Sequence, residues 1–246
     1  MAGWIAFGTT DIGLLRERNE DAYALDGALG CYLVADGMGG HRGGDVASAT
    51  ARDAALNALR AGAERLADDP AAGLARAICA ANAAVHHAAG RDPALHGMGT
   101  TLSLLWLGDD GEAAAAHVGD SRIYRLDGER LAQITVDHTQ AEALVGAGYM
   151  TREEARHSPA GHMLTRGVGL DAGVEVDAFA VDAAAAHAFL LCSDGLTGMV
   201  ADDAIASILR GHAGDPATAC EALIDAAIAG GGHDNVSVVV VSRLLP

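Results

Sequence analysis

The sequence predicts an α+β protein in which helices cover antiparallel sheets. Apolar runs rich in β-branched and aromatic residues, which are typical of strands, alternate in blocks with alanine-rich stretches, which are typical of helices. Tight turns such as Asp127-Gly128 join strands that follow one another directly, and such turns give antiparallel pairs. Because no internal repeat or long linker divides the chain, we predict one domain over residues 1–246.

Strands and helices alternate in the first half of the chain. The ranges predicted as strands are 4–10, 22–25 and 31–36, and those predicted as helices are 45–67 and 71–89. Asp45 is the expected N-cap of the first helix, and Gly90 and Pro93 end the second. The polar cluster over residues 16–21, between the first two strands, is typical of a solvated loop.

The second half predicts a strand meander, an insertion and a helical end. The meander comprises strands over 98–107, 113–118, 121–126 and 130–134. A short helix over 139–146 and another opened by the Thr151–Glu154 capping box place a surface insertion at about 137–169. The predicted elements that follow are strands over 174–179 and 187–192, helices over 201–211 and 217–229, and a strand over 236–241.

Composition and charge exclude several classes of protein. Half of the residues are hydrophobic, so the chain is not disordered, and its formal net charge is −17. A general nucleic-acid binder needs a basic surface, and an anionic membrane would repel such a chain. We therefore predict no nucleic-acid partner and no membrane partner, and we expect a monomer.

The cysteines indicate a reducing compartment. None of Cys31, Cys79, Cys192 and Cys220 belongs to a C-x-x-C pair, and their density does not suggest a disulfide framework. Residues 1–13 lack the basic start and apolar stretch of a signal peptide, and no apolar run reaches about 18 residues. These features predict a cytoplasmic protein.

The apolar run that begins at Tyr32 ends in one carboxylate, Asp36, which is followed at once by glycines. Such a residue either caps a turn or holds a metal ion at the exit of a strand. The same pattern recurs downstream, where the apolar run that begins at Phe189 is followed by Asp194 and Gly195. Two strand ends of this kind could bring Asp36 and Asp194 together, which favours the metal-binding interpretation.

Further carboxylates lie beside glycines or in the early polar cluster. The full set is Glu20, Asp21, Asp36, Asp120, Asp194 and Asp234. Oxygen-only ligands suit hard ions such as Mg²⁺ and Mn²⁺, and no His/Cys set has zinc-site spacing. Because several clustered acids repel each other unless cations lie between them, the set suggests a two-metal site for phosphoryl chemistry.

Five motifs in order resemble one family. They are Arg16-x-x-Asn19-Glu20-Asp21, Asp36-Gly37-Met38-Gly39-Gly40, Gly119-Asp120-Ser121-Arg122, Ser193-Asp194-Gly195-Leu196 and Asp234-Asn235-Val236-Ser237. Together they resemble the bacterial branch of the metal-dependent, protein phosphatase 2C-like serine/threonine phosphatases (the PPM family), from about residue 8 to residue 241. The resemblance implies a four-layer αββα sandwich of two antiparallel sheets flanked by helices, with residues 137–169 as a flap.

The resemblance also implies roles for single residues. Asp36 would bridge two Mn²⁺ or Mg²⁺ ions, with the Gly37 carbonyl contacting one and Asp194 and Asp234 holding the first. The remaining implied ligands are Glu20 and Asp21, which would bind the water shell, and Asp120, which would hold a third, weaker ion together with Asp194. Arg16 would bind the substrate phosphate, although its spacing alone equally suggests a surface ion pair.

One departure from the family concerns the proton for the leaving group. Many eukaryotic relatives carry histidine at the position of Met38, and methionine cannot donate a proton. Two sources therefore compete: His41, three residues later, and a metal-bound water.

The predicted function is hydrolysis of phosphoserine and phosphothreonine on proteins by a metal-activated water, which reverses a serine/threonine kinase. No phosphoenzyme would form. Two alternatives are a catalytically silent binding module and a metal-dependent phosphodiesterase acting on nucleotides. The complete acid set argues against the first, and the scarcity of aromatic residues, at 4%, argues weakly against the second.

Overall fold

The computed structural model describes residues 3–39, 43–108, 111–156 and 158–244. Two sheets lie face to face at its centre, and every strand pair in them is antiparallel. The first sheet contains, in spatial order, β1 (Trp4–Asp11), β11 (Val236–Arg243), β10 (Ala188–Cys192), β7 (Arg122–Asp127) and β8 (Arg130–Gln133). The second contains β2 (Asp21–Asp26), β3 (Cys31–Met38), β5 (Leu102–Leu107), β6 (Glu112–Val118) and β9 (Asp177–Asp182), with β4 (Gly99–Thr100) paired to the end of β3.

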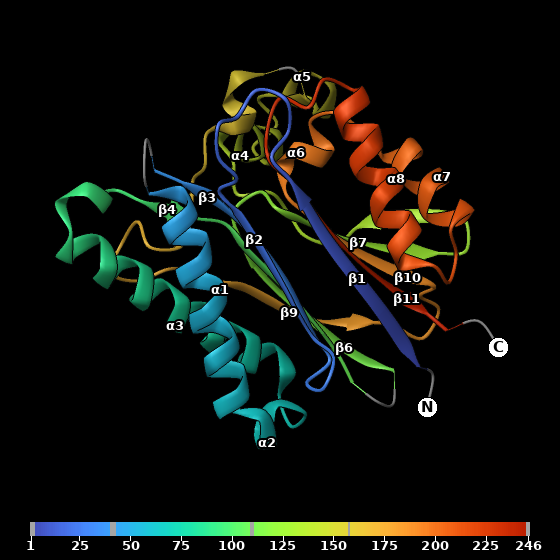
Figure 1. The fold of residues 1–246 in the computed structure, drawn as a ribbon, viewed down its shortest axis with the longest axis horizontal. Coiled ribbons are helices and arrows are strands. Elements are labelled where there is room, and N and C mark those ends of the chain that lie inside the picture. The colour runs from blue at the N-terminus through green and yellow to red at the C-terminus, as the bar shows by residue number, and fades with distance from the viewer. Residues whose placement is uncertain (1–2, 40–42, 109–110, 157, 245–246) are drawn as a thin grey trace.

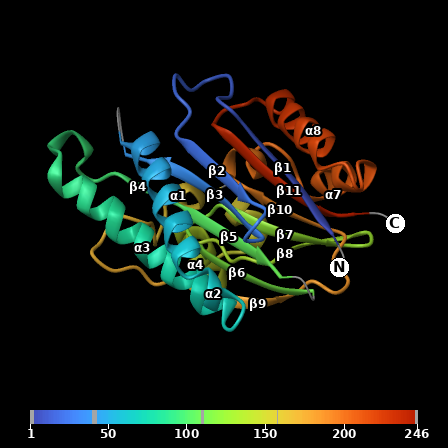
Figure 2. The same cartoon turned by 60° about the horizontal axis from the view of Figure 1, so that its bottom comes forward.

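Helices cover the outer face of each sheet (Figure 1). The second sheet is covered by α1 (Gly44–Ala61), α2 (Ala63–Leu66) and α3 (Pro70–Arg91), which is followed by the 3₁₀ turn η2 (Pro93–Leu95). The first sheet is covered by α7 (Asp202–Gly211) and α8 (Pro216–Ala229), and α6 (Asp194–Thr197) follows β10 directly. Figure 2 shows the same layers from another side. The predicted four-layer α+β sandwich is confirmed.

The alternation of side chains along each strand explains the layers. On β3, Leu33 faces the helices α1 and α3, whereas Tyr32 and Val34 lie in the core between the two sheets. On β10, Leu190 faces α7 and α8, whereas its neighbours Phe189 and Leu191 enter the same central core. Each strand therefore contributes to two apolar cores, and this explains the long uninterrupted apolar runs in the sequence.

Two helical predictions need correction. The single helix expected over 45–67 is divided at Gly62, where α1 ends and the short α2 begins, because glycine gives the backbone little preference for continuing a helix. Asp45 is not the N-cap: Gly43 occupies that position, and Asp45 lies in the first turn, where a negative charge is favourable.

Two strand predictions also need correction. The strand expected over 98–107 is divided into β4 and β5, because the hydroxyl of Thr101 accepts a hydrogen bond from the N–H of Asp36 and its own N–H donates to the Asp36 carbonyl. The strand expected over 174–179 begins only at Asp177 and runs to Asp182, because its partner β6 pairs with those residues.

The segment over residues 137–169, predicted as a flap and called the flap below, contains α4 (Gln140–Gly146), α5 (Arg152–Arg156) and the 3₁₀ turn η3 (Pro159–His162). The capping box is confirmed: the Thr151 N–H donates to Glu154 and the Glu154 N–H donates to the Thr151 hydroxyl, at 2.8 and 3.2 Å. Figure 1 shows the flap helices, α6 and the loop between β1 and β2 at the same end of the sandwich. In the described part of the chain, no helix is both long and apolar enough to span a bilayer.

Candidate metal centre

The site begins where β3 leaves the second sheet. Strand pairing places Asp21 of β2 directly opposite Asp36 of β3. Residues opposite each other in an antiparallel pair project from the same face, and residues two apart on a strand share a face. Because Val34 lies between the two sheets, Asp36 and Asp21 project towards the same gap at its end. Two carboxylates are therefore side by side.

The end of β10 in the first sheet adds Asp194. The preceding residue, Ser193, donates a hydrogen bond from its hydroxyl to Asp21 Oδ2 at 2.7 Å and accepts one from the Ser237 N–H at 2.9 Å. Ser193 thereby joins β10 and β11 to β2 across the two sheets. This contact brings Asp194, at the start of α6, close enough for its charge to raise the pKa of Asp36.

Asn235 fixes the loop between β1 and β2 against the start of β11. Its amide donates to the carbonyls of Ile12 and Arg18 at 2.9 and 2.8 Å, and its Oδ1 accepts from the Glu20 N–H at 2.8 Å. The loop carries Arg16, whose Nη2 donates to Asp234 Oδ2 at 2.6 Å. The ion pair that the sequence left open for Arg16 is therefore present, and its partner is a predicted metal ligand.

Gly37 allows three segments to meet. A Cβ at this position would lie 2.0 Å from the Gly44 carbonyl oxygen and 2.6 Å from that of Glu20, so only glycine fits. The Gly37 N–H donates to the Glu20 carbonyl at 3.1 Å, and the Glu20 carboxylate lies against Gly44 at the start of α1. Burial and the charge of Asp45 raise the pKa of Glu20, while the Gly44 N–H lowers it.

Asp120 is placed by the turn between β6 and β7. The preceding Gly119 has φ of +109°, and a Cβ there would lie 2.6 Å from the Thr101 side chain. Thr101 shares a hydrogen bond of 2.6 Å with the Ser121 hydroxyl and accepts one from the Asp36 N–H at 2.9 Å. Thr101 thus links the strand end that carries Asp36 to the turn that carries Asp120.

Three of these carboxylates, Asp21, Asp36 and Asp120, form what we call the floor of the site. Burial raises the pKa of Asp36 well above its ordinary value, and the charges of Asp21, Asp194 and Asp120 raise it further. Burial together with Asp194 raises the pKa of Asp21 to about 7, against hydrogen bonds that lower it. Burial, then Asp194 and Asp137, raise the pKa of Asp120 to about 7.

No basic side chain of the described residues forms an ion pair with the floor. Oδ1 of Asp21 is buried and has no hydrogen-bond partner in that part of the chain. Carboxylate groups that repel one another, with an unpartnered oxygen among them, fit hard divalent ions such as Mg²⁺ or Mn²⁺.

All of the described residues predicted for the site converge at this end of the sandwich: Arg16, Glu20, Asp21, Asp36, Gly37, Asp120, Asp194 and Asp234. His41, the predicted alternative acid, lies outside the described residues. The predictions assigned no role to Ser193, Thr101 or Asn235, which hold the site together. Ser193 and Asn235 stand within the quoted motifs, next to Asp194 and Asp234, and that adjacency was the available signal.

Among the described residues of the flap, His162 lies beside the site. Nδ1 of His162, in η3, lies 3.7 Å from Asp194 Oδ2, and its side chain is 78% exposed. The interaction with Asp194 raises the pKa of His162 above its ordinary value. His162 therefore contacts a predicted metal ligand from the solvent side. We define the rim of the site as Arg16, Asp234 and His162.

Comparisons with known proteins place this geometry in a family. The family model described as protein phosphatase 2C matches residues 16–216. A serine/threonine phosphatase of Listeria monocytogenes is 36% identical over 238 residues, which cover 95% of this chain and 94% of that protein. The serine/threonine protein phosphatase PstP of Mycobacterium tuberculosis is 39% identical over 94% of this chain, which spans 43% of that longer protein.

Solved structures of related phosphatases share this fold. The crystal structure of the Mycobacterium tuberculosis phosphatase PstP superposes with a TM-score of 0.88 at 35% identity, covering 98% of this chain and 99% of that chain. A structure of the PstP catalytic domain in complex with two manganese ions gives a TM-score of 0.81 at 34% identity, covering 98% and 99%. The chain therefore belongs to the protein phosphatase 2C family and is a metal-dependent serine/threonine protein phosphatase of the bacterial PPM type.

Proposed function

We propose that this phosphatase hydrolyses phosphoserine and phosphothreonine on proteins with two Mn²⁺ or Mg²⁺ ions held by Asp36, Asp194 and Asp234. The floor supports this proposal most strongly, because its carboxylates have no ion-pair partner within the described residues and because burial, together with the charges of nearby carboxylates, raises the pKa of each. The relative solved with two manganese ions gives further support.

Each carboxylate has a proposed role that follows from its place. Asp36, opposite Asp21 and influenced by Asp194 and Asp120, would be the ligand shared by the two ions, and the Gly37 carbonyl would be a further ligand of one ion. Glu20 and Asp21 accept hydrogen bonds from the water shell of the ions. Asp120 holds a third, weaker ion together with Asp194, because their charges act on each other.

When bound, the divalent ions supply hydroxide near neutral pH and neutralise charge that develops on the phosphoryl group. Arg16 contributes the recognition of phosphate. Its guanidinium donates one hydrogen bond to Asp234 and can exchange that partner for phosphate oxygens, since carboxylate and phosphate oxygens both accept from a guanidinium. The half-exposed position of Arg16, at 51%, leaves room for this exchange.

The proton donor for the leaving group stays a prediction. A seryl or threonyl oxygen leaves poorly without a proton, whereas p-nitrophenolate does not need one. If His41 donates that proton, His41→Ala should slow the phosphopeptide reaction by roughly a hundredfold and leave p-nitrophenyl phosphate hydrolysis nearly unchanged. An equal, weak response of both substrates would exclude His41 from that role.

The proposed setting is the cytoplasm, opposite a serine/threonine kinase whose phosphoproteins are the substrates. Four unpaired thiols, three of them buried, support a reducing compartment. Relatives described as serine/threonine phosphatases support the choice of substrate class.

The experiment that tests the function uses the purified chain and a phosphothreonine peptide. We expect release of phosphate with Mn²⁺ or Mg²⁺, none with EDTA, and recovery when the ion is restored. A bis-p-nitrophenyl ester, assayed in parallel, reports phosphodiesterase activity and should be a poor substrate. Undiminished hydrolysis in EDTA, or a preference for the diester, would contradict the proposal.

A further inference from the structure

One residue holds both backbone polar groups of the glycine before Asp120. His138 stands at the start of the flap and is only 5% exposed. Its N–H donates to the Gly119 carbonyl at 2.9 Å, and its ring Nδ1 accepts from the Gly119 N–H at 3.1 Å. The position of Asp120, the next residue, therefore depends on a two-point clamp made by His138.

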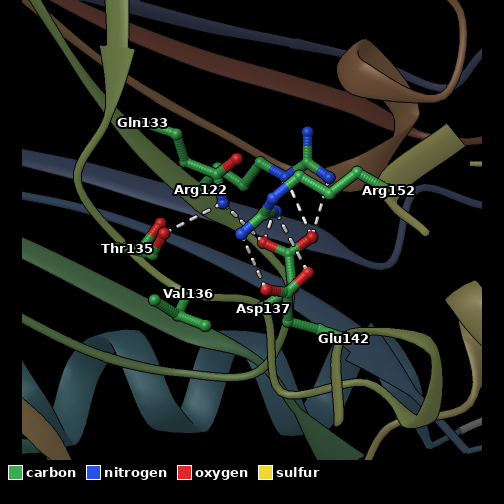
Figure 3. A pocket seen from close by; sticks show the side chains of 7 residues that line it. All are labelled: Arg122, Gln133, Thr135, Val136, Asp137, Glu142 and Arg152. Carbon is green, nitrogen blue, oxygen red and sulfur yellow. Dashed lines mark hydrogen bonds and ion pairs between the residues drawn. The ribbon is translucent and has the colours of Figure 1, made fainter. Parts of the chain in front are cut away.

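The neighbouring Asp137 holds the other side of the same turn. Three hydrogen bonds of 2.7 to 3.0 Å join the Arg122 guanidinium to Asp137, and the Gln133 side chain adds a fourth at 2.8 Å. Figure 3 shows Asp137 and Arg122 facing each other at a cavity of about 270 Å³. Two consecutive residues thus hold the segment from Gly119 to Arg122 at both ends, with Asp120 between them.

The ring of His138 is itself held from two sides. Its Nε2 lies 3.3 Å from Asp177 Oδ2, and Asp177 accepts a hydrogen bond from Arg166 at 2.7 Å through its other oxygen. The ring of His117 stacks on it with the centroids 4.3 Å apart. His138 Nε2 makes no hydrogen bond within the described residues. Its approach to Asp177 and the stacked His117 ring therefore restrict the imidazole without locking it, while Nδ1 is held by Gly119.

The same three residues resemble a metal site, because single ligand atoms of His117, His138 and Asp177 lie within 4.8 Å of one another. The hydrogen bond to Gly119 argues against that role. A backbone N–H can only donate, so Nδ1 of His138 must be the unprotonated nitrogen and Nε2 must carry the proton of the neutral ring. A ligating Nε2 would need the opposite tautomer, which would set two donors against each other.

We propose that His138 is a positioning residue, which fixes the Asp120 carboxylate through Gly119 and so sets the affinity of the cation site formed by Asp120 and Asp194. This inference rests on the proposed role of Asp120. It also links that site to the flap, because the His138 carbonyl accepts from the Thr165 N–H at 2.8 Å, and the next residue, Thr139, caps α4. A displacement of the flap would thus move the turn that carries Asp120.

Two substitutions at His138 separate its two contacts. In asparagine, Oδ1 is as many bonds from Cβ as Nδ1 is in histidine, so His138→Asn keeps an acceptor for Gly119 and loses the contact with Asp177. In glutamine, the terminal amide reaches the place of Nε2, so His138→Gln keeps a donor for Asp177 and loses the acceptor. A residue that served only to fill space would respond alike to both.

Two measurements follow these variants. Hydrogen exchange of the Gly119 amide, resolved by NMR in the metal-free protein, reports the clamp, and calorimetric titration with Mn²⁺ reports the affinities. In His138→Gln we expect faster hydrogen exchange at the Gly119 amide. The affinity of the weakest Mn²⁺ site should fall about tenfold, as it does when a metal ligand loses the residue that orients it, and the affinities of the tighter sites should not change. In His138→Asn both readouts should stay within about threefold of the unsubstituted protein.

A second pair of variants keeps the test decisive if His138→Gln does not fold. Asp177→Ala removes a half-exposed partner of the ring and should weaken the clamp by about threefold. The same substitution made in His138→Asn should add nothing to either readout, because that contact is already absent. If Asp177→Ala changed amide exchange or Mn²⁺ affinity further in the double variant, the proposed positioning role of His138 would be contradicted.

The outcomes distinguish this inference from the proposed function. If the unsubstituted protein shows no third Mn²⁺ binding event, the role of Asp120 in the proposed function fails and the inference falls with it. If the third event is present but His138→Gln and His138→Asn shift it equally, or neither shifts it, only the inference is overturned.

Discussion

The floor and the rim of the metal centre differ in how their charges are balanced. Within the described residues, none of the floor carboxylates Asp21, Asp36 and Asp120 takes part in an ion pair. On the rim, Asp234 is paired with Arg16, and His162 lies near Asp194. From this difference we expect the floor to depend on added cations and the rim to exchange one partner for another when a substrate binds.

The two regions also differ in what places them. Strand register and hydrogen bonds to backbone groups hold the floor, since Asp21 lies opposite Asp36 and Thr101 joins the segments of Asp36 and Asp120. Arg16 and His162 come from a loop and a 3₁₀ turn. We therefore expect substitution of Asp36 on the floor to cost far more activity than substitution of Arg16 or His162 on the rim.

The largest effect is expected for Asp36→Asn. Loss of the bridging carboxylate should remove both ions and lower turnover by several orders of magnitude, measured on a phosphothreonine peptide with Mn²⁺. The variant should also lose the rise in melting temperature that Mn²⁺ gives the unsubstituted protein, because a ligand that binds only the folded state stabilises it.

Asp26→Asn is the matched control for that variant. Asp26 stands at the opposite end of the β2–β3 pair and is bonded to Arg60 at 2.9 Å, away from the floor. Its turnover should remain near normal. Similar turnover in the two variants would mean that the charge of Asp36 has no special role.

The second effect concerns the stability of the metal-free protein. Because Asp21 and Asp120 have pKa values of about 7 when folded and near 4 when unfolded, the folded state binds more protons between these values. The contribution of these two groups to the free energy of unfolding should therefore be greatest below about pH 4. It should fall by a few kcal/mol as the pH rises through about 7.

Chemical denaturation in EDTA at a series of pH values measures this trend. Saturating Mn²⁺ should reverse its direction, since cations bind the ionised carboxylates. Parallel curves with and without Mn²⁺ would show that the floor does not bind the ion.

The third effect concerns Arg16 on the rim. Arg16→Ala should raise KM for the phosphopeptide by about 10- to 100-fold, as expected for lost hydrogen bonds between charged groups. Mn²⁺ affinity should stay equal or rise, because Arg16 and the cations compete for Asp234. Arg16→Lys keeps the positive charge but not the two-pronged guanidinium, so its KM should lie between those of the unsubstituted protein and Arg16→Ala. A loss of Mn²⁺ affinity in Arg16→Ala would identify Arg16 as structural.

The smallest effect is expected for His162→Ala. Its side chain is largely exposed and lies 3.7 Å from Asp194, so its loss should change kcat and KM by no more than about threefold. Steady-state kinetics at pH 6 and pH 8 check this. A loss as large as that of Asp36→Asn would place His162 among the essential groups.

The sequence predicted which carboxylates lie close together better than it predicted the bounds of the elements that carry them. Asp36, Asp120 and Asp194 were recognisable because each follows an apolar run or adjoins glycine, and Glu20, Asp21 and Asp234 because their motifs matched a family in order. Which of them face one another depends on strand register, here Asp21 opposite Asp36, and register between distant segments has no local signal.

The elements were harder to predict where tertiary contacts override local preference. Thr101 interrupts an apolar run that alone favours one long strand, because it bonds to the backbone of Asp36. Gly62 ends α1 within a stretch whose alanine content favours a continuous helix. The hydrogen bonds between His138 and Gly119 join residues 19 positions apart, and no local sequence pattern around either residue predicts them.

Anomalous diffraction from crystals grown with Mn²⁺ tests the central claim most directly, because it locates the ions without reference to activity. We expect two strong peaks within ligand distance of the Asp36 carboxylate, one of them also contacting Asp194 and Asp234, and a weaker peak beside Asp120. A crystal of the active protein with no manganese peak at Asp36 would contradict the account.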